Sequence, residues 1–389
     1  MTLSTLNEDD NPVDWWFAYK LPALPNLIFD EDPNNSVGKS QGTEYLYCDS
    51  TSPALPRELS SNKKINRKIL ESGALVNTIR QLHVAAEKHD PQIGWFCYND
   101  EHPKLDHLLI PCAPIDNFDF GHTKGVIAFD LGTNTAFWML HSWPCYPSIS
   151  ITPVAPPSPL FGQTFLCITL KDVATADAIA EVFHAQSQPQ ITDMYLPGTI
   201  DVKTYPYLVQ LAADMPRSIV PTTVPLGSNM PSDTTFMSRN GQEFRLFAKS
   251  KDWIDPATDK VQAPKDLYSD LIGPTLKVDL DVETWQQGGE SDTDSDPAYT
   301  TKDIQWIDLQ ALGPNYAWKF LFHDHAKWAV SVDLDKQNET DWVIVADINR
   351  VDTQYKRGGV GIAFQNQALA HSLHSIIKTV SSAENNNKE

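Results

Sequence analysis

The strongest constraint on this chain is a short motif that occurs twice, once in each half of the sequence. His122 and Lys124 stand two positions apart, just before the apolar run VIAF, and His325 and Lys327 stand two apart before WAVSV. Apolar runs rich in β-branched and aromatic residues predict buried strands. Because residues i and i+2 of a strand face the same way, we expect each histidine to lie beside its own lysine.

The surroundings of the motif repeat as well. An aspartate follows each apolar run, Asp130 in the first half and Asp333 in the second, and a turn and another apolar strand come next. This pattern predicts one structural unit used twice, with a pseudo-twofold axis that brings both histidine–lysine pairs into one cleft. The alternative is coincidence, with each histidine simply hydrogen-bonded inside the core.

A cleft that holds two histidines and two lysines suits phosphoryl transfer. The lysines would neutralise phosphate oxygens in the transition state. One neutral imidazole would attack phosphorus, and the other, protonated, would donate its proton to the leaving oxygen. This chemistry calls for no cofactor or metal, because the lysines supply the positive charge. It favours low pH, because one histidine must carry a proton.

Composition narrows the function further. The net charge of −20 opposes nucleic-acid binding at neutral pH. That charge shrinks in acid as histidines and carboxylates gain protons, so an anionic substrate would bind better there. No apolar run approaches the length of a membrane span, and the polar, acidic start carries no secretory signal. The five irregularly spaced cysteines favour buried free thiols.

Periodicity predicts strands in the first half at residues 14–20, 45–49, 94–99, 126–129, 137–141 and 163–170. Residues 70–88 and 175–185 have helical spacing, the latter with Asp172 or Thr175 as N-cap. In the second half we expect a long irregular region after 211, a strand at 342–346 and a helix at 364–379. Residues 286–297 form an acidic low-complexity insertion rather than a calcium loop, since Pro297 stands where such a loop needs glycine.

Longer segments resemble one known family, deoxyribonuclease II, the acid endonucleases with a phospholipase D-like fold. They are VDWWFAYKLPAL (13–24), YLYCD (45–49), GHTKG (121–125), FWMLHSWPCYP (137–147), FGQTFLC (161–167), DHAKWAVS (324–331), DWVIVADINR (341–350) and QYKRGG (354–359). The resemblance implies an α/β fold of mixed sheets flanked by helices, in two pseudo-twofold-related halves. We expect a polar arm at 1–12, a first half at 13–190, a second half at 191–379 that contains the insertion, and a polar tail at 380–389.

The same resemblance implies metal-independent hydrolysis of double-stranded DNA in acid through a phosphohistidine, with 3′-phosphate and 5′-hydroxyl ends. The catalytic residues that it implies are His122, Lys124, His325, Lys327 and His141. The residues expected to bind substrate are Asp347, Asn349, Arg350, Lys356, Arg357 and Trp143. We expect His122 to be the nucleophile and His325 the general acid, although the motifs leave the reverse assignment open.

Two other functions stay open on the sequence. One is a phosphodiesterase of the same fold that acts on a phospholipid or another nucleic acid, and the other is a non-catalytic DNA-binding relative. Asp130 and Asp333 each stand one residue further from the lysine than in the superfamily pattern, so they are expected to be structural. Relatives are lysosomal or secreted and carry disulfides in the second half, where this chain has no cysteine. A non-lysosomal bacterial member and a homodimer are both compatible with the sequence.

Overall fold

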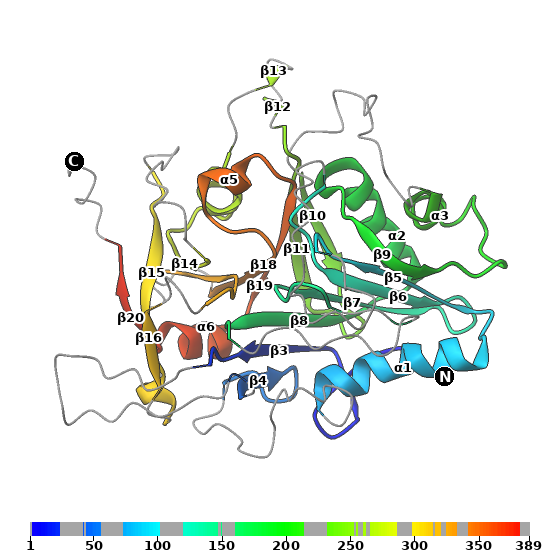
Figure 1. Ribbon diagram of the computed structural model, residues 1–389, viewed down its shortest axis with the longest axis horizontal. Helices are drawn as coiled ribbons and strands as arrows, with labels where there is room; N and C mark the ends of the chain where they lie inside the picture. Colours follow the sequence, from blue (N-terminus) through cyan, green and yellow to red (C-terminus); the bar gives the residue numbers. More distant parts are fainter. Residues whose placement is uncertain are drawn as a thin grey trace, which may run out of the picture.

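Two large β-sheets form the frame of the protein, and each is built from one half of the chain (Figure 1). The computed structural model describes residues 2–23, 42, 44–55, 73–101, 120–146, 149, 160–213, 232–252, 254–255, 260–261, 265–285, 298–313, 316–319, 324–332 and 341–381. The predicted insertion at 286–297, Asp333 and most of the polar tail lie outside these residues.

The first sheet is antiparallel at every described strand pair. Its strands, in spatial order, are β4 (Tyr45–Asp49), β3 (Trp15–Lys20), β8 (Gln163–Leu170), β7 (Thr135–His141), β6 (Gly125–Asp130), β5 (Ile93–Tyr98) and β9 (Ile191–Tyr195). The last strand lies beyond residue 190, so the first sheet reaches a few residues past the expected end of the first half.

The second sheet is mixed, because β14 and β15 pair in parallel whereas its other described pairs are antiparallel. Its strands, in order, are β10 (Ser232–Met237), β11 (Glu243–Lys249), β19 (Gly359–Gln365), β18 (Trp342–Ala346), β17 (Trp328–Ser331), β14 (Leu280–Glu283), β15 (Thr301–Asp308) and β16 (Ala317–Lys319), with β20 (Ile377–Val380) also paired to β15. Two short pairs lie outside both sheets: β1 (Thr5–Leu6) with β2 (Pro12–Val13), and β12 (Ile254–Asp255) with β13 (Lys260–Val261).

Five strands of each sheet follow the same order. The run β3-β8-β7-β6-β5 matches β11-β19-β18-β17-β14, and in both runs a histidine–lysine motif directly precedes the fourth strand. The α/β, phospholipase D-like architecture expected from the sequence is therefore present. The repeat seen in the motif extends through the sheets.

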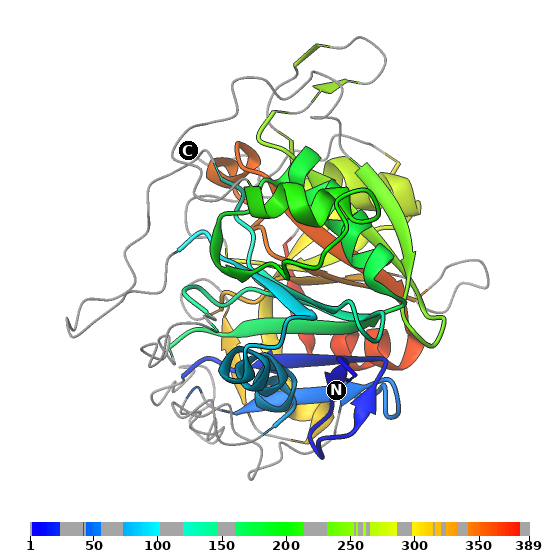
Figure 2. The same ribbon diagram turned by 90° about the vertical axis from the view of Figure 1, so that its right-hand side faces the viewer.

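Helices cover both faces of the first sheet, which explains why its central strands are buried on every residue rather than on alternate ones. On β3, Trp15 and Phe17 face the core between the sheets, whereas Trp16 and Ala18 face the opposite side. Figure 2 shows α1 on one side of this sheet and α2 and α3 on the other. The helical segments are α1 (Ala74–Lys88), α2 (Val173–Val182), α3 (Pro206–Ala213), α4 (Gly273–Leu276), α5 (Asp352–Tyr355), α6 (Gln367–His374), η1 (Phe183–Ser187), η3 (Tyr268–Ile272) and η4 (Leu309–Leu312).

The core between the sheets is continuous across the two halves. Trp15 of the first half stacks on Phe364 of the second, with ring centroids 5.4 Å apart, and Tyr19 packs on Trp328 at 6.2 Å. Each such fully buried side chain contributes about 1.5–3 kcal/mol relative to an exposed one. The two halves therefore share one hydrophobic core. No described helix is long and apolar enough to cross a bilayer.

The structure corrects several predictions in the second half. The region after 211 is not irregular throughout, since β10 and β11 lie there, and Phe244, Leu246 and Ala248 alternate toward the core. The predicted helix at 364–379 is shorter: β19 occupies its start, and the Asn366 side chain caps α6 by accepting from the Leu369 N–H at 2.9 Å. The segment ends in β20 rather than in helix.

The described cysteines include both free thiols and a disulfide-bonded residue. Cys48, Cys97 and Cys167 are buried free thiols, as expected, whereas Cys145 is disulfide-bonded. Cys112 lies outside the described residues. The irregular cysteine spacing carries no information on pairing, which is why the sequence could not predict this bond.

Candidate active site

The two motifs occupy equivalent places, as their backbone hydrogen bonds show. The His141 N–H of β7 donates to the Lys124 carbonyl at 3.1 Å, and the Ala346 N–H of β18 donates to the Lys327 carbonyl at 3.0 Å. One residue further on, Ser142 and Asp347 each donate to the next strand of their own sheet. These matching bonds set a residue-by-residue correspondence between the halves.

Each histidine backbone is also held by the opposite half. The His122 N–H donates to the Gly358 carbonyl at 2.8 Å, and the His325 N–H donates to the Gly162 carbonyl at 3.0 Å. Neither glycine has room for a side chain: a Cβ on Gly358 would lie 2.5 Å from the Ser187 carbonyl oxygen, and one on Gly162 would overlap the Asp324 carboxylate. The site therefore lies where the two sheets meet.

The His122 ring lies among charged and polar groups. Its Nδ1 lies 2.5 Å from the Asp347 carbonyl oxygen, and its Nε2 lies 3.6 Å from the Asp100 carboxylate. The Lys124 ammonium, 3.4–3.5 Å from both ring nitrogens, pairs with the same carboxylate, as does Arg357 at 3.1 Å. Burial lowers the pKa of His122 well below its ordinary value; Lys124 lowers it further and Asp100 opposes the shift.

The Asp100 carboxylate stays ionised in this cluster. Burial alone would raise its pKa, but Lys124, His122 and Arg357 outweigh burial and hold the pKa well below the usual range. It therefore serves as the fixed negative charge of the first motif.

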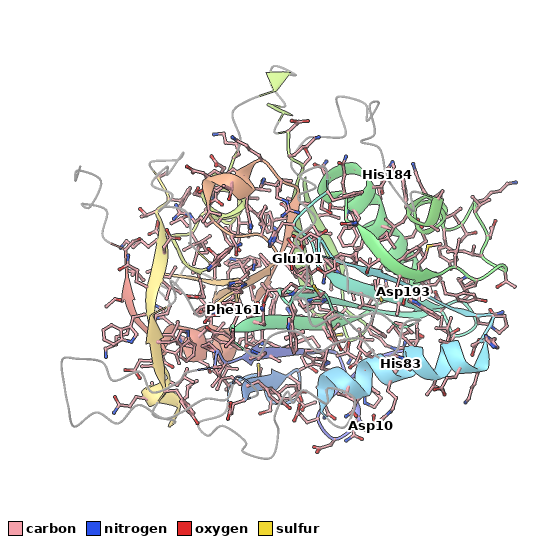
Figure 3. All side chains as sticks on the ribbon, in the orientation of Figure 1. Asp10, His83, Glu101, Phe161, His184 and Asp193 are labelled. Carbon is pink, nitrogen blue, oxygen red and sulfur yellow. The ribbon has the colours of Figure 1, made fainter. Side chains whose placement is uncertain are left out.

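The His325 ring has different neighbours. It stacks on Phe161, with centroids 4.1 Å apart and planes 18° from parallel, and on Trp285 at 4.6 Å and 36°. Its ring nitrogens have no hydrogen-bond partner among the described residues, and Nε2 is buried. Burial, and then the charges of Lys327, Lys124 and Lys20, lower the pKa of His325 to about 3. Figure 3 shows Phe161 and Glu101, the neighbour of Asp100, toward the middle of the molecule.

The structure brings the two pairs close enough to influence one another. Burial, and then the nearby Lys124 charge, lower the pKa of Lys327 to about 7. The Lys327 ammonium donates to the carbonyl of its own histidine at 2.9 Å, and the backbone N–H of Lys327 donates to Thr164 Oγ1 of the first half at 3.0 Å. The two histidine–lysine pairs thus lie near one another, and their joint role in one catalytic site stays a prediction.

His141 lies behind the first motif. It is fully buried, its Nδ1 accepts from the Trp143 N–H at 3.1 Å, and its Nε2 has no partner in the described part of the chain. Burial, and then the Lys124 charge, lower its pKa to about 3. Its side chain makes no hydrogen bond to either motif. A catalytic role for His141 stays a prediction, and the contacts favour a supporting one.

The residues after β18 divide into two groups. Asp347 accepts the Val360 N–H on Oδ1 at 2.9 Å, whereas its buried Oδ2 has no partner among the described residues, and burial raises its pKa to about 8. Asn349 Oδ1 is likewise buried without a described partner. Arg350, by contrast, is 2 % exposed and pairs with Asp266 at 3.1 Å and Asp303 at 2.8 Å. These two ion pairs hold its loop in place and leave the guanidinium turned away from solvent.

The other predicted contact residues have the following places. Lys356 is exposed, Arg357 is half-buried against Asp100 and the Phe120 carbonyl, and Trp143 is buried and stacked on Tyr146 at 5.6 Å. Asp130, expected to be structural, accepts the Gly132 N–H at 2.8 Å and so caps a turn. Within the described residues no group of three or more metal-ligand side chains is arranged to hold an ion.

Three residues of the site escaped prediction from the sequence: Asp100, Phe161 and Trp285. Asp100 and Trp285 occupy equivalent positions, each two residues beyond the strand that pairs with its motif strand. Phe161 and Arg357 are equivalent too, each directly before the glycine that holds the opposite histidine. The only available signal for Phe161 was the FG pair that opens the segment FGQTFLC.

The two sheets share their strand order, and a histidine–lysine pair directly precedes the same strand in each, which is the phospholipase D-like architecture expected from the sequence. Comparison with known proteins narrows this class. The family model for deoxyribonuclease II matches residues 4–383, so the chain belongs to the deoxyribonuclease II family and is a DNA-hydrolysing nuclease of that type.

Individual relatives agree with this assignment. A Burkholderia pseudomallei protein provisionally named deoxyribonuclease-2 is 40 % identical over 380 residues, covering 96 % of this chain and 92 % of its own length. A Caenorhabditis elegans protein named deoxyribonuclease-2 is 29 % identical, covering 97 % of this chain and 92 % of its own. Deoxyribonuclease-2-beta of Rattus norvegicus is 28 % identical, covering 96 % and 91 %. The similarity therefore extends over both halves.

Proposed function

We propose that this nuclease cleaves double-stranded DNA in acid without a divalent metal, through a covalent phosphohistidine, and leaves 3′-phosphate and 5′-hydroxyl ends. The observation that carries the proposal is the meeting of His122, Lys124, His325 and Lys327 at one site between the sheets. In this scheme one histidine attacks phosphorus and the other transfers protons. The two lysines stabilise the charge that develops on the phosphoryl oxygens.

Acid pH favours the binding of an anionic substrate in this scheme. Since the pKa of Lys327 lies at about 7, its ammonium is charged at pH 5 and loses its proton above neutrality. Since the pKa of Asp347 lies at about 8, this carboxyl is neutral at pH 5 and its unpartnered Oδ2 can donate to a phosphate oxygen rather than repel it. Asp347 and Lys327 therefore act as substrate-binding groups that weaken together as the pH rises. Asn349 is also assigned to substrate binding in this proposal, although its buried Oδ1 can only accept a hydrogen bond.

The remaining predicted contacts take secondary places in the proposal. Arg357 offers a guanidinium at the edge of the site, and Lys356 is an exposed cation beside it. We propose that Arg350 stabilises the loop that carries Asp347, because both of its ion pairs lie inside the second half. Trp143 and His141 then have a structural role, since the Trp143 N–H donates to His141 and the His141 N–H donates to the Lys124 carbonyl.

Supercoiled plasmid nicking at pH 5 in excess EDTA tests the proposal. The wild-type chain should nick in EDTA, and activity should fall steeply between pH 6 and 8. The His122→Gln and His325→Gln variants should lose about 10³-fold or more, whereas His371→Gln on the exposed face of α6 should cleave like wild type. Cleavage that requires added Mg²⁺, or that persists in both motif variants, would contradict the proposal.

The ends of the products test the mechanism separately. Nicked plasmid should accept label at its 5′ ends from polynucleotide kinase without prior phosphatase. It should prime DNA polymerase only after phosphatase has removed the 3′-phosphate. The opposite pattern would show that the other ester bond of the phosphodiester breaks.

A further inference from the structure

The two histidines lie on equivalent backbone, yet their side-chain surroundings differ in kind. At two pairs of equivalent positions the His122 side has Asp100 and Arg357, whereas the His325 side has Trp285 and Phe161. If the two sides were alike, either histidine could be the nucleophile and either the general acid. The different neighbours give the two histidines different roles.

Hydrogen bonding fixes which nitrogen of His122 carries a proton. Since Nδ1 lies 2.5 Å from the Asp347 carbonyl oxygen, which can only accept, Nδ1 must be the N–H donor. The other nitrogen, Nε2, lies 3.6 Å from the Asp100 carboxylate. The Lys124 ammonium lies 3.5 Å from the same nitrogen, so a neutral His122 could accept a hydrogen bond there. A protonated His122 would present its two N–H groups to two acceptors, the Asp347 carbonyl and the Asp100 carboxylate, which is the arrangement of a proton donor.

The faces of the His325 ring contact aromatic rings, whereas the edge of the His122 ring contacts hydrogen-bonding groups. Stacking on Phe161 and Trp285 fixes the ring plane and consumes no lone pair, so the nitrogens at the ring edge stay available for attack. The charges that most affect this ring are those of Lys327, Lys124 and Lys20, all of which disfavour imidazolium. A neutral, desolvated and oriented imidazole is the form that a nucleophile needs.

Both rings are buried beside lysines, and the negative charge of a bound phosphodiester raises the proton affinity of both. The substrate does not remove the difference made by the carboxylate, because of the two histidines only His122 lies beside Asp100. We infer that His325 is the nucleophile that becomes phosphorylated and that His122, paired with Asp100, is the general acid and then the general base. This reverses the assignment expected from the sequence, and it rests on the proposed function.

The steps balance as follows. A ring nitrogen of His325 forms the N–P bond while the P–O5′ bond breaks, and O5′ takes the Nε2 proton of His122 and leaves as a hydroxyl. His122, now neutral at Nε2, removes a proton from water as the water oxygen bonds to phosphorus. The N–P bond then breaks, which releases the 3′-phosphate and restores both histidines.

A substrate with an acidic leaving group separates the two roles. The p-nitrophenyl ester of thymidine 3′-phosphate expels p-nitrophenolate, which needs no proton from the enzyme. The His122→Gln variant should therefore still release about one equivalent of p-nitrophenol in a burst and then stall, because no base activates water. The His325→Gln variant should release none. Base-quenched digests of the stalled His122→Gln protein should contain a thymidine 3′-phosphoryl group on the peptide with His325.

The outcomes are distinct for the inference and for the proposed function. A thymidine 3′-phosphoryl group on His122 in the His325→Gln variant, with a burst in that variant and none in the other, would overturn the assignment while the nuclease mechanism stands. Steady turnover of the ester by both variants would overturn it as well. A wild-type protein that cleaves neither DNA nor the ester in EDTA would instead refute the proposed function, and the inference would fail with it.

Discussion

The two halves of this nuclease share a backbone and differ in four side chains around their histidines. In the first half the ring contacts a carboxylate that is held by two cations, and in the second it contacts two aromatic rings. The backbone bonds that hold the rings are nearly the same, 2.8 Å and 3.0 Å to the opposite glycine. The repeated backbone thus gives the two histidines equivalent positions, and the side chains of neighbouring segments give the two rings different chemistry.

Replacing each lysine should have the largest effect and tests the contrast between the two halves most directly. Lys124 is ion-paired with Asp100, whereas the described residues give Lys327 no ion pair and only a carbonyl, that of His325. We expect Lys124→Met and Lys327→Met each to lower kcat/KM for DNA by about 10²–10³-fold. Their effects on unfolding should differ: Lys124→Met should lower the melting temperature at pH 5. Lys327→Met should leave it unchanged or raise it, because burial disfavours that charge in the folded state.

Calorimetry at pH 5 beside plasmid nicking would measure both effects. Equal destabilisation by the two variants would show that the lysines sit in equivalent electrostatic surroundings, and the contrast between the halves would be lost. Far-UV circular dichroism of each variant would confirm that the loss of activity does not come from unfolding.

This contrast also shows where the sequence stops being informative. The motifs could be found because each carries its histidine, lysine and strand within a few residues. Asp100 and Trp285 could not, because the stretch between each of them and its motif differs greatly in length in the two halves. Their equivalence appears only in strand register. Likewise Phe161 reaches His325 across the junction between the sheets, a contact that no local pattern encodes.

The same reasoning explains the misplaced elements. Alternation at Phe244, Leu246 and Ala248 was present in the sequence, but it lay in a stretch rich in proline and charge that favoured a loop. The strand β19 was hidden by Gly359 and Gly361, whose lack of side chains lowers strand propensity. Position 359 requires a small residue because Ile348 packs against it, and a Cβ there would lie only 2.8 Å from the isoleucine side chain.

Asp100→Asn should have the next largest effect. Removing the carboxylate takes away the group that stabilises protonated His122, so DNA cleavage should fall by about 10²-fold. Cleavage of the p-nitrophenyl ester should fall much less in its burst phase. The variant also leaves Lys124 buried without its carboxylate, so the free energy of unfolding should drop by about 3 kcal/mol.

Asp130→Asn is the matched control. Asp130 is a buried aspartate on the next strand whose carboxylate only caps a turn. It should reduce stability without changing the ratio of DNA to ester cleavage. If Asp100→Asn altered both substrates by the same factor, Asp100 would be a structural residue and would not position a proton.

Phe161→Leu tests the aromatic side of the comparison with a smaller effect. Leucine keeps the apolar contact and loses the stacking, which is worth about 0.5–1.5 kcal/mol, so kcat should fall by about threefold to tenfold. Because a nucleophile acts on both substrates, DNA and ester should be affected alike, in contrast to Asp100→Asn. Unequal effects on the two substrates would argue that the stack orients the leaving group and not the His325 ring.

The smallest effect on activity is expected at Asp347, which stands where the first half has Ser142. Burial raises the pKa of this carboxyl to about 8, so the folded chain binds a proton that the unfolded chain releases near pH 4. The contribution of Asp347 to the free energy of unfolding should therefore decrease as the pH rises from about 4 toward 8. The lowered pKa values of His122, His141 and His325 act in the opposite sense below about pH 6.5, and that of Lys327 does so above pH 7. The quantity to measure is therefore the difference between the urea midpoints of the wild type and of Asp347→Asn, whose amide is neutral throughout and whose cleavage at pH 5 should drop less than about tenfold. From pH 5 to 7 the wild type should lose stability relative to Asp347→Asn. A difference that does not change with pH would place the titrating group elsewhere, and the neutral hydrogen-bond donor assigned to the second half would be lost.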